Sequence, residues 1–194
     1  MTPRAPDPRT ARTVGALRDA LHVLIAQRPV DEVTVTQLCA AAAVPRTTFY
    51  SHFSSVPDLL VTMLVDAVRG VISVNEPAPD IEATAALFLS RFADALELIR
   101  RERGMFRAGF ASSRAGLFSR ELEAMLARQV EIAIDIWKQF GIVDGADRRV
   151  AVPFIAGALT AVLHAWTGCE DTDSAAWTAA TLSEMPEWWP RPPR

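Results

Sequence analysis

The segment from Thr34 to Leu60 constrains the fold more than any other part of the chain, because it contains the start signals of two short helices in succession. Thr34 can cap a helix, since its hydroxyl can accept a hydrogen bond from a backbone N–H one turn on, and Gln37 can reach back to complete a capping box. The alanine-rich run that follows favours a short, closely packed helix. Proline is tolerated in the first turn of a helix, so a second helix is predicted from Pro45 to about His52. Two short helices joined by a tight turn form a helix-turn-helix.

The second predicted helix has one apolar face and one polar face. Phe49 and Phe53 are four residues apart, so they lie on one side and face a core. The polar side suits a DNA duplex, because Arg46 can form a bidentate contact with guanine and Thr47 can offer its hydroxyl or methyl group to a base. Other side chains on that side can donate to phosphate oxygens, which set the register of a bound protein. The predicted DNA-binding residues are Thr34, Thr36, Arg46, Thr47, Thr48, Tyr50 and His52.

This segment resembles the N-terminal domain of the tetracycline-repressor (TetR) family of bacterial transcription regulators. The residues that carry the resemblance are Thr34, Val35, Leu38, Val44, Thr48, Phe49, Tyr50, His52 and Phe53. The likeness extends upstream through Leu17–Pro29, which is similar to the family's first helix, and downstream through Asp58–Leu60, which is similar to the opening of its fourth. The resemblance implies a homodimer that binds a palindromic operator and a small-molecule effector held in the C-terminal domain. Repression is the family default, and activation stays open.

Three positions depart from the family pattern. Ala43 stands where the family usually has glycine in the turn, and because a positive φ would cost an alanine about 1 kcal/mol, we expect a slightly different turn there. Pro29 replaces a second glycine and ends the first helix by another route. Val56 stands where a lysine often contacts the DNA backbone, and the loss of one phosphate contact should weaken binding to all sequences alike. These departures bear on DNA affinity more than on the fold.

Apolar residues at helical spacing continue beyond this segment, so we expect an all-α protein. The expected division is a helix-turn-helix domain at residues 1–56, with a short disordered N-terminal arm, and a helical effector-binding and dimerisation domain at residues 57–194. The predicted helices are Thr10–Gln27, Pro57 to about Val74, Ile81 to about Ile99, a helix or loop over Met105–Ser113, Phe118–Phe140 closed by Gly141, about Ala146–Trp166, and Asp173–Met185, with a proline-marked loop at Asn75–Asp80 and Gly104 as an interruption.

The predicted helix over about Ala146–Trp166 is apolar all round, which is typical of a helix buried on both sides. In a chain of 194 residues, one side would face its own domain and the other a second copy of the chain, with the last helix joining a two-fold four-helix interface. The alternative is a central core helix with no role in assembly. The predicted dimer residues are Phe154, Ala158, Ala161, Ala165 and Trp177.

The resemblance also implies a ligand cavity among the C-terminal helices, and aromatic and methionine side chains suit such a cavity. The ordinary alternative for each of them is a place in the core, and for His164 a core or interface position satisfied by a hydrogen bond. Five arginines around the middle loop would suit an anionic effector or a solvated surface. The candidate ligand residues are Phe88, Phe92, Met105, Phe106, Phe110, Met125, Trp137, His164 and Trp166, and the arginines are Arg100, Arg101, Arg103, Arg107 and Arg114.

Charge and motifs limit the other classes of function. The net charge of −3 argues against a nonspecific nucleic-acid binder covered in positive charge. Positive charge does collect near the N-terminus, where Arg4, Arg9, Arg12 and Arg18 could meet phosphates. No phosphate loop, nucleophile elbow or H-E-x-x-H pair occurs, and the two cysteines lack metal-ligand spacing, so we expect no enzyme activity, metal or cofactor.

No run approaches the roughly 18 apolar residues that a membrane span requires, and the N-terminus lacks the apolar core of a signal peptide, so we expect a cytoplasmic protein. The leading interpretation is a homodimeric transcriptional regulator, with repression as its mode of action. The alternative is an all-α ligand-binding or protein-interaction module of the same fold with weak or lost operator binding, which the departures at Ala43 and Val56 would favour.

Overall fold

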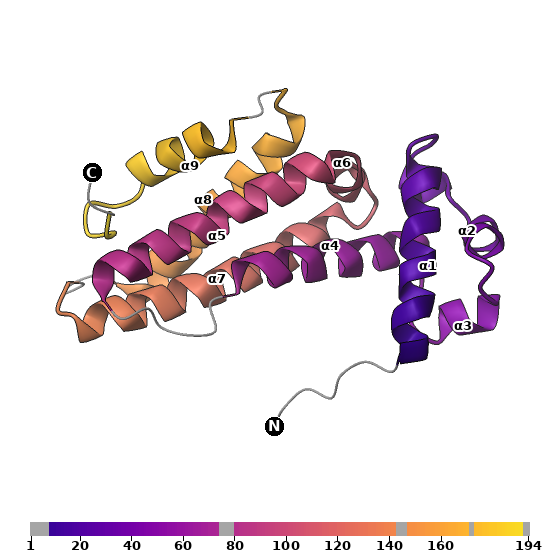
Figure 1. Ribbon diagram of the computed structural model, residues 1–194, viewed down its shortest axis with the longest axis horizontal. Coiled ribbons are helices and arrows are strands. Elements are labelled where there is room, and N and C mark those ends of the chain that lie inside the picture. The colour runs from indigo at the N-terminus through magenta and orange to yellow at the C-terminus, as the bar shows by residue number, and fades with distance from the viewer. Residues whose placement is uncertain (1–7, 74–79, 143–146, 171–172, 192–194) are drawn as a thin grey trace. The chain divides into compact units, whose positions relative to one another are not determined.

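The computed structural model of this protein describes residues 8–73, 80–142, 147–170 and 173–191 (Figure 1). Every regular element in these ranges is a helix. The described residues up to Leu64 form one compact unit with Gly104–Gly116, and Val65–Arg103 forms a second with those from Leu117 onward. The predicted all-α class, with an N-terminal helix-turn-helix followed by a helical C-terminal part, is confirmed. The expected N-terminal arm and the loop at Asn75–Asp80 lie outside the described residues, apart from their last positions.

The first unit is built around the helix-turn-helix, and α1 packs against α2, as α2 does against α3 (Figure 1). Its core consists of side chains that are almost completely buried, namely Leu17, Leu21, Leu38, Phe49, Val56, Leu59 and Leu60. Its elements are α1 (Pro8–Ile25), the 3₁₀ helix η1 (Val30–Glu32), α2 (Val35–Ala41), α3 (Arg46–Tyr50), the first part of α4 (Val56–Ile72), and α6 (Arg103–Ala111).

The start of α2 follows the prediction, whereas α3 is shorter than expected. The Gln37 backbone N–H donates to Thr34 Oγ1 at 3.2 Å, and the Thr34 N–H donates to Gln37 Oε1 at 3.0 Å, so the capping box is present. Pro45 has an extended backbone with a ψ of 140°, so it is the N-cap residue of α3 and lies just outside the helix. At the other end the Ser51 hydroxyl donates to the carbonyl of Thr48 at 2.7 Å, which ends the helix before His52.

The turn after α2 differs from the expectation. Ala43 adopts a φ of 52°, so the prediction that it avoids a positive φ is wrong. The Val44 N–H donates to the carbonyl of Cys39 at 3.0 Å and the Ala43 N–H donates to that of Ala40 at 3.3 Å, which is the hydrogen-bond pattern of a Schellman motif. These two bonds satisfy carbonyls at the helix end, and the exposed Cβ of Ala43 meets no packing constraint. The turn therefore keeps its left-handed residue without a glycine.

The second unit is a bundle in which α5 packs against both α8 and α9 (Figure 1). Its helices are the last part of α4, α5 (Ile81–Arg101), α7 (Ala115–Gln139), α8 (Arg148–Gly168) and α9 (Ser174–Ser183). Two fully buried tryptophans anchor it. The indole N–H of Trp166 donates to the carbonyl of Leu96 at 2.8 Å, which joins α8 to α5. The ring of Trp137 lies 4.3 Å from that of Trp189, between centroids, so the C-terminal segment also packs on the core.

The predicted ends of the long helices agree with the structure to within a few residues. Gly141 closes α7 as expected, with a φ of 73° and hydrogen bonds that again form a Schellman motif, from Gly141 to Lys138 and from Ile142 to Trp137. Gly104 does not interrupt the helices as predicted, because it lies inside α6. The break comes instead at Glu102, whose φ of −106° and ψ of 27° end α5.

The apolar stretch of α8 is longer than the sequence pattern predicted. This helix is long and apolar enough to cross a membrane by length and composition alone, so the expectation that no run approaches this limit is wrong. Of its most apolar window, 39% is buried within the chain. One side of α8 contributes Val152, Ile155 and Leu163 to the core, and the other side is apolar but exposed. The composition thus reflects a helix with two apolar faces.

Replacing Ala43 by glycine should stabilise the protein by about 1 kcal/mol, because glycine adopts a positive φ without the steric cost that alanine carries. Urea denaturation at a fixed protein concentration measures the change. Ala40→Gly is the matched control, since this exposed alanine lies inside α2 and its replacement should destabilise by about 1 kcal/mol. Equal destabilisation by the two variants would contradict the strained turn.

Candidate functional site

The outer face of α3 presents the polar side chains that the sequence predicts for DNA binding. Phe49 is 0% exposed and anchors the helix, whereas Tyr50 is 53% exposed. Arg46 and Thr47 are also exposed. The Tyr50 ring packs edge-on against that of Phe49, with centroids 5.5 Å apart. Of the remaining candidates on this segment, His52 is exposed and Thr48 is half-buried.

The two threonines near the start of α2 differ in what their side chains can do. Both Thr34 and Thr36 are exposed. The Thr34 hydroxyl accepts from the Gln37 N–H and lies 3.0 Å from Gln37 Oε1, to which it can donate, so its hydrogen bonds serve the cap of α2. The capping of α2 is therefore by itself a sufficient reason for a threonine at position 34, apart from its predicted role in DNA binding. Thr36 is the second residue of α2, with its side chain at the surface.

Cys39 lies on the buried side of α2, the helix that packs against α3. Burial raises the pKa of its thiol, and the positive charge of Arg46 opposes this shift to a smaller extent. The thiol is therefore neutral at physiological pH and acts as a small apolar side chain between α2 and its neighbours. Both Cys39 and Cys169 are free thiols.

Val56 occupies a core position at the start of α4. Its side chain is 2% exposed, so it packs inside the first unit and does not reach a phosphate from there. Ser55 precedes it and caps the helix, because the Asp58 N–H donates to its hydroxyl at 3.2 Å. The family pattern predicts a surface position for Val56, from which a phosphate contact is lost. The spacing of Val56 to Leu59 and Leu60, however, is that of a buried helical face.

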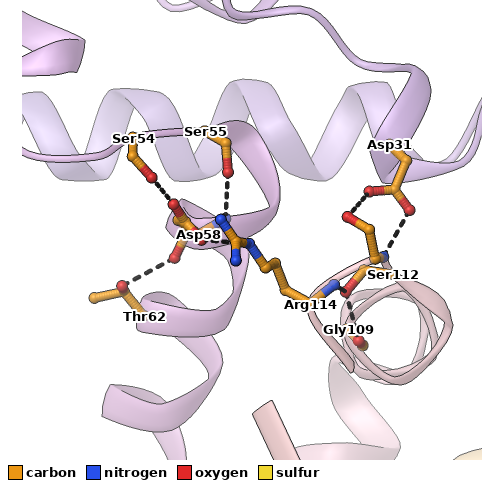
Figure 2. Close-up of polar contacts among 9 residues, drawn as sticks. Asp31, Ser54, Ser55, Asp58, Thr62, Gly109, Ser112 and Arg114 are labelled. Atoms are coloured by element: carbon orange, nitrogen blue, oxygen red, sulfur yellow. Dashed lines mark hydrogen bonds and ion pairs between the residues drawn. The ribbon is translucent and has the colours of Figure 1, made fainter. Parts of the chain in front are cut away.

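A group of polar contacts, which we call the turn clamp, joins the turn after α6 to the helix-turn-helix within the first unit (Figure 2). It consists of Asp31, Asp58, Ser113 and Arg114. The Ser113 N–H donates to one carboxylate oxygen of Asp31 at 2.8 Å, and its hydroxyl donates to the other at 2.5 Å. Arg114 Nε lies 3.0 Å from Asp58 Oδ1. The turn clamp thus ties η1 and the first turn of α4 to one short segment.

The turn clamp was missed in the sequence because its partners are far apart along the chain. Asp31 and Ser113 are separated by 82 positions, and neither belongs to a motif. Arg114 was grouped with the arginines of the middle loop as part of a solvated surface or an anion site. In the structure its side chain is 49% exposed, while that of Asp58 is only 21% exposed. Asp58 also accepts a hydrogen bond from Ser54, so its carboxylate is held from two sides (Figure 2).

A cavity of about 60 Å³ lies in the second unit among α5, α7, α8 and α9. Of the nine candidate ligand residues, Phe88 and Phe92 line it. The remaining candidates lie elsewhere: Met105, Phe106 and Phe110 on α6 in the first unit, Trp137 and Trp166 fully buried in the core, Met125 half-buried on α7, and His164 exposed on α8. The structure therefore brings only two of the nine together at this cavity.

The sequence did not single out several residues that line the cavity. Among them are Ile72, Arg91, Gln129, Thr178, Thr181 and Trp189. Arg91 was within reach of a sequence argument, because it follows Phe88 by three positions and so shares its helical face. The contribution of α9 and Trp189 to the cavity could not be predicted from the sequence, since it depends on how the last segment folds back over the bundle.

Four of the five candidate dimer residues form an exposed stripe on α8. Phe154 is 65% exposed and Val150 is 64% exposed, although both are large apolar residues. Ala158, Ala161 and Ala165 continue this stripe and are exposed. Trp177 on α9 is half-buried, with its ring centroid 5.0 Å from that of Trp166. A groove of about 700 Å³ runs between α8 and α9 and is lined by Phe154, Ala158 and Trp177 among others.

A capped α2, a tight turn and a short α3 with a polar outer face define a helix-turn-helix protein, a class whose second helix reads the major groove of DNA. Residues 17–63 match the family model described as "Bacterial regulatory proteins, tetR family". The chain therefore carries the N-terminal domain of the TetR family, from α1 into α4, and the resemblance seen in the sequence is confirmed. No curated protein sequence matches the chain.

Solved structures share the fold over nearly the whole chain. A TetR-family transcriptional regulator from Syntrophomonas wolfei is 17% identical with a TM-score of 0.65, over 90% of this chain and 93% of that one. NalD is described as the secondary repressor of the MexAB-OprM multidrug efflux pump in Pseudomonas aeruginosa. It is 14% identical with a TM-score of 0.60, over 92% of this chain and 100% of NalD. RolR in complex with resorcinol is 20% identical with a TM-score of 0.57, over 91% of this chain and 89% of RolR. At these identities the likeness establishes the fold of TetR-family regulators.

A double-mutant cycle should detect the ion pair of the turn clamp. We expect Asp58→Ala and Arg114→Ala to show a coupling free energy of about 0.5 kcal/mol in urea denaturation, because the pair is partly shielded from water. The matched control is the pair of Arg128 and Glu131, which are 3.6 Å apart with side chains 73% and 47% exposed, and whose coupling should be near zero. A coupling free energy near zero in both cycles would show that the Asp58–Arg114 pair adds no stability.

Proposed function

We propose that this protein is a transcriptional regulator that binds a palindromic DNA operator as a homodimer and represses by occupying it, with a small-molecule effector releasing it. The observation that carries the proposal is the exposed polar face of α3 on a helix-turn-helix that matches the TetR family model. Regulators of this family are generally not enzymes, which agrees with the motifs absent from the sequence. We further propose that the protein acts in the cytoplasm and that the functional division falls near residue 56.

Arg46 and Thr47 would recognise the base sequence of the operator in the major groove. Arg46 stands at the first position of α3 and is exposed, so its guanidinium can reach the edge of a guanine. Tyr50 is one turn further on and would donate its hydroxyl to a phosphate, as Thr36, Thr48 and His52 would from the flanks. A dimer places two such helices in successive major grooves, about one helical turn apart or more.

We propose that the stripe on α8 and the groove beside α9 bind a second copy of the chain. Two large apolar side chains more than 60% exposed are unfavourable in water, and their burial against an identical stripe removes this cost. The alanines that continue the stripe beyond Phe154 allow two α8 helices to approach closely. A stripe that is complementary to itself fits a two-fold axis, which is also what a palindromic operator requires.

The cavity in the second unit is the proposed effector site. RolR, which shares the fold, is described in complex with resorcinol, and this supports a small-molecule ligand for the present chain as well. Ile72, at the C-terminal end of α4, lines the cavity, and the N-terminal end of the same helix holds Val56 in the core beside α3. An effector that favours one position of α4 would thus change the separation of the two reading helices, so that only one state fits the operator.

A second candidate function is a ligand-binding or protein-interaction module with weak or lost operator binding. The observation in its favour is the burial of Val56, which removes a phosphate contact that the family often makes from this position. Loss of one contact reduces affinity and flattens its salt dependence without removing the base contacts of α3. Operator binding therefore discriminates the two functions.

Arg46→Ala should weaken binding to the protein's own operator by about tenfold or more and relax the sequence preference, because a bidentate base contact contributes about 1–3 kcal/mol. Tyr50→Ala should weaken binding to all sequences alike. The operator is selected from random DNA with the wild-type protein, and affinities are measured by fluorescence anisotropy at several salt concentrations. Arg101→Ala, an exposed arginine on α5, is the control. A wild-type protein without sequence-selective, salt-dependent binding would favour the alternative module.

Phe154→Asp should convert the dimer into a monomer, because it places a charge in the apolar stripe that the partner would have to desolvate. Sedimentation velocity measures the change, and the monomer should also lose operator affinity. Phe140→Asp is the matched control, since Phe140 is a 46% exposed phenylalanine directly after α7 and is not a member of the stripe. A Phe154→Asp protein that stays dimeric would place the interface elsewhere.

A further inference from the structure

The described wall of the cavity includes a charged side chain, that of Arg91, which has one buried donor without a hydrogen-bond partner. Arg91 lines the cavity, and its Nε is buried without a hydrogen-bond partner among the described residues. Among the described residues its guanidinium has a long ion pair, 3.5 Å between Nη1 and Asp94 Oδ2, on the side of α5 where the Arg91 side chain is 41% exposed. A buried donor without a partner costs about 1–3 kcal/mol, so an acceptor that reaches Nε would be favoured.

None of the described residues of the wall accepts a hydrogen bond from Arg91 Nε. Thr178 and Thr181 donate their hydroxyl protons to carbonyls of their own helix, Ser174 and Trp177, at 2.7 Å and 2.8 Å. The remainder of the wall is mostly apolar, with Phe88, Leu159 and Leu182 among its members. The cavity is therefore an apolar slot with a cation at its wall.

The size of the cavity restricts the apolar part of a ligand. Its volume of about 60 Å³ is less than half of the roughly 150 Å³ void that takes up benzene in an engineered protein core. A flexible alkyl chain can place part of its length in so small a space, whereas a rigid ring must enter whole. Several wall residues, including Leu182 and Met185, are only half-buried, so the slot can be reached from the surface and can widen by side-chain rotation.

We infer that the effector is a straight-chain carboxylic acid, whose carboxylate pairs with the guanidinium of Arg91 and whose alkyl chain lies in the apolar slot. The inference rests on the proposed function, because it names the chemical class of ligand for the proposed effector site. A carboxylate can accept two hydrogen bonds from one guanidinium, and such charge-assisted pairs are stronger than neutral ones. The chain would lie near Ile72 and so contact the end of α4.

The inference is tested by isothermal titration calorimetry of the full chain with hexanoate, hexanol, hexylamine and cyclohexanecarboxylate, without DNA. Hexanoate should bind about tenfold more tightly than hexanol or hexylamine, and more tightly than the ring acid. Arg91→Gln should weaken hexanoate binding by about tenfold and leave hexanol unchanged, and Arg91→Lys should lie between, because it keeps the charge but loses the fork. Arg101→Gln, on the exposed surface of the same helix, should bind hexanoate like the wild type.

Three results would overturn the inference: no binding of hexanoate, binding of hexanol as tight as that of hexanoate, or equal loss of affinity in Arg91→Gln and Arg101→Gln. Tighter binding of the ring acid would overturn the straight-chain class. A second variant, Thr178→Phe, fills the slot and should abolish binding of hexanoate and hexanol alike, and unchanged binding in it would place the site elsewhere. Because the titration contains no DNA, hexanoate binding supports the inference even if operator binding fails, and its absence overturns the inference even if the operator is bound.

Discussion

The burial of Phe49 is the constraint on which the proposed reading surface depends. Its side chain is 0% exposed, and because each residue of a helix is rotated by a fixed angle from the last, the position of Phe49 fixes the direction of every other side chain on α3. Arg46 and Tyr50 are held outward for this reason and need no partner of their own to be oriented. The reading face is therefore a consequence of packing on the opposite side of a very short helix.

A helix of five residues is not stable alone, so its neighbours must hold it in place. The capping box fixes the start of α2, and the Schellman motif around Ala43 fixes its end and the direction in which the chain enters α3. The left-handed Ala43 shows that two helix-end hydrogen bonds can outweigh the steric cost of a Cβ. The turn clamp adds contacts from a distant segment, through which Asp31 and Asp58 are tied to the same turn (Figure 2).

The second unit shows how one helix can have two apolar sides for different reasons. The inner side of α8 is anchored by Trp166, whose indole N–H is paired with α5. Its outer side carries Phe154 and a row of alanines at the surface, next to the groove beside α9. We assign this outer side to a second copy of the chain, and the small slot with Arg91 in its wall to an acidic effector. Both assignments rest on groups that the single chain leaves unsatisfied: exposed apolar area in one case and a buried donor in the other.

The sequence alone was sufficient to predict the helical class, the capping box at Thr34, the closure of α7 by Gly141 and the outward face of α3. These features depend on neighbours within about one helical turn, so local spacing contains the information. It did not predict the conformation of Ala43, the burial of Val56, the turn clamp or the wall of the cavity. Only the tertiary structure decided these, because each depends on contacts between segments far apart in the chain, and side-chain spacing along one helix does not record which distant segment will pack against it.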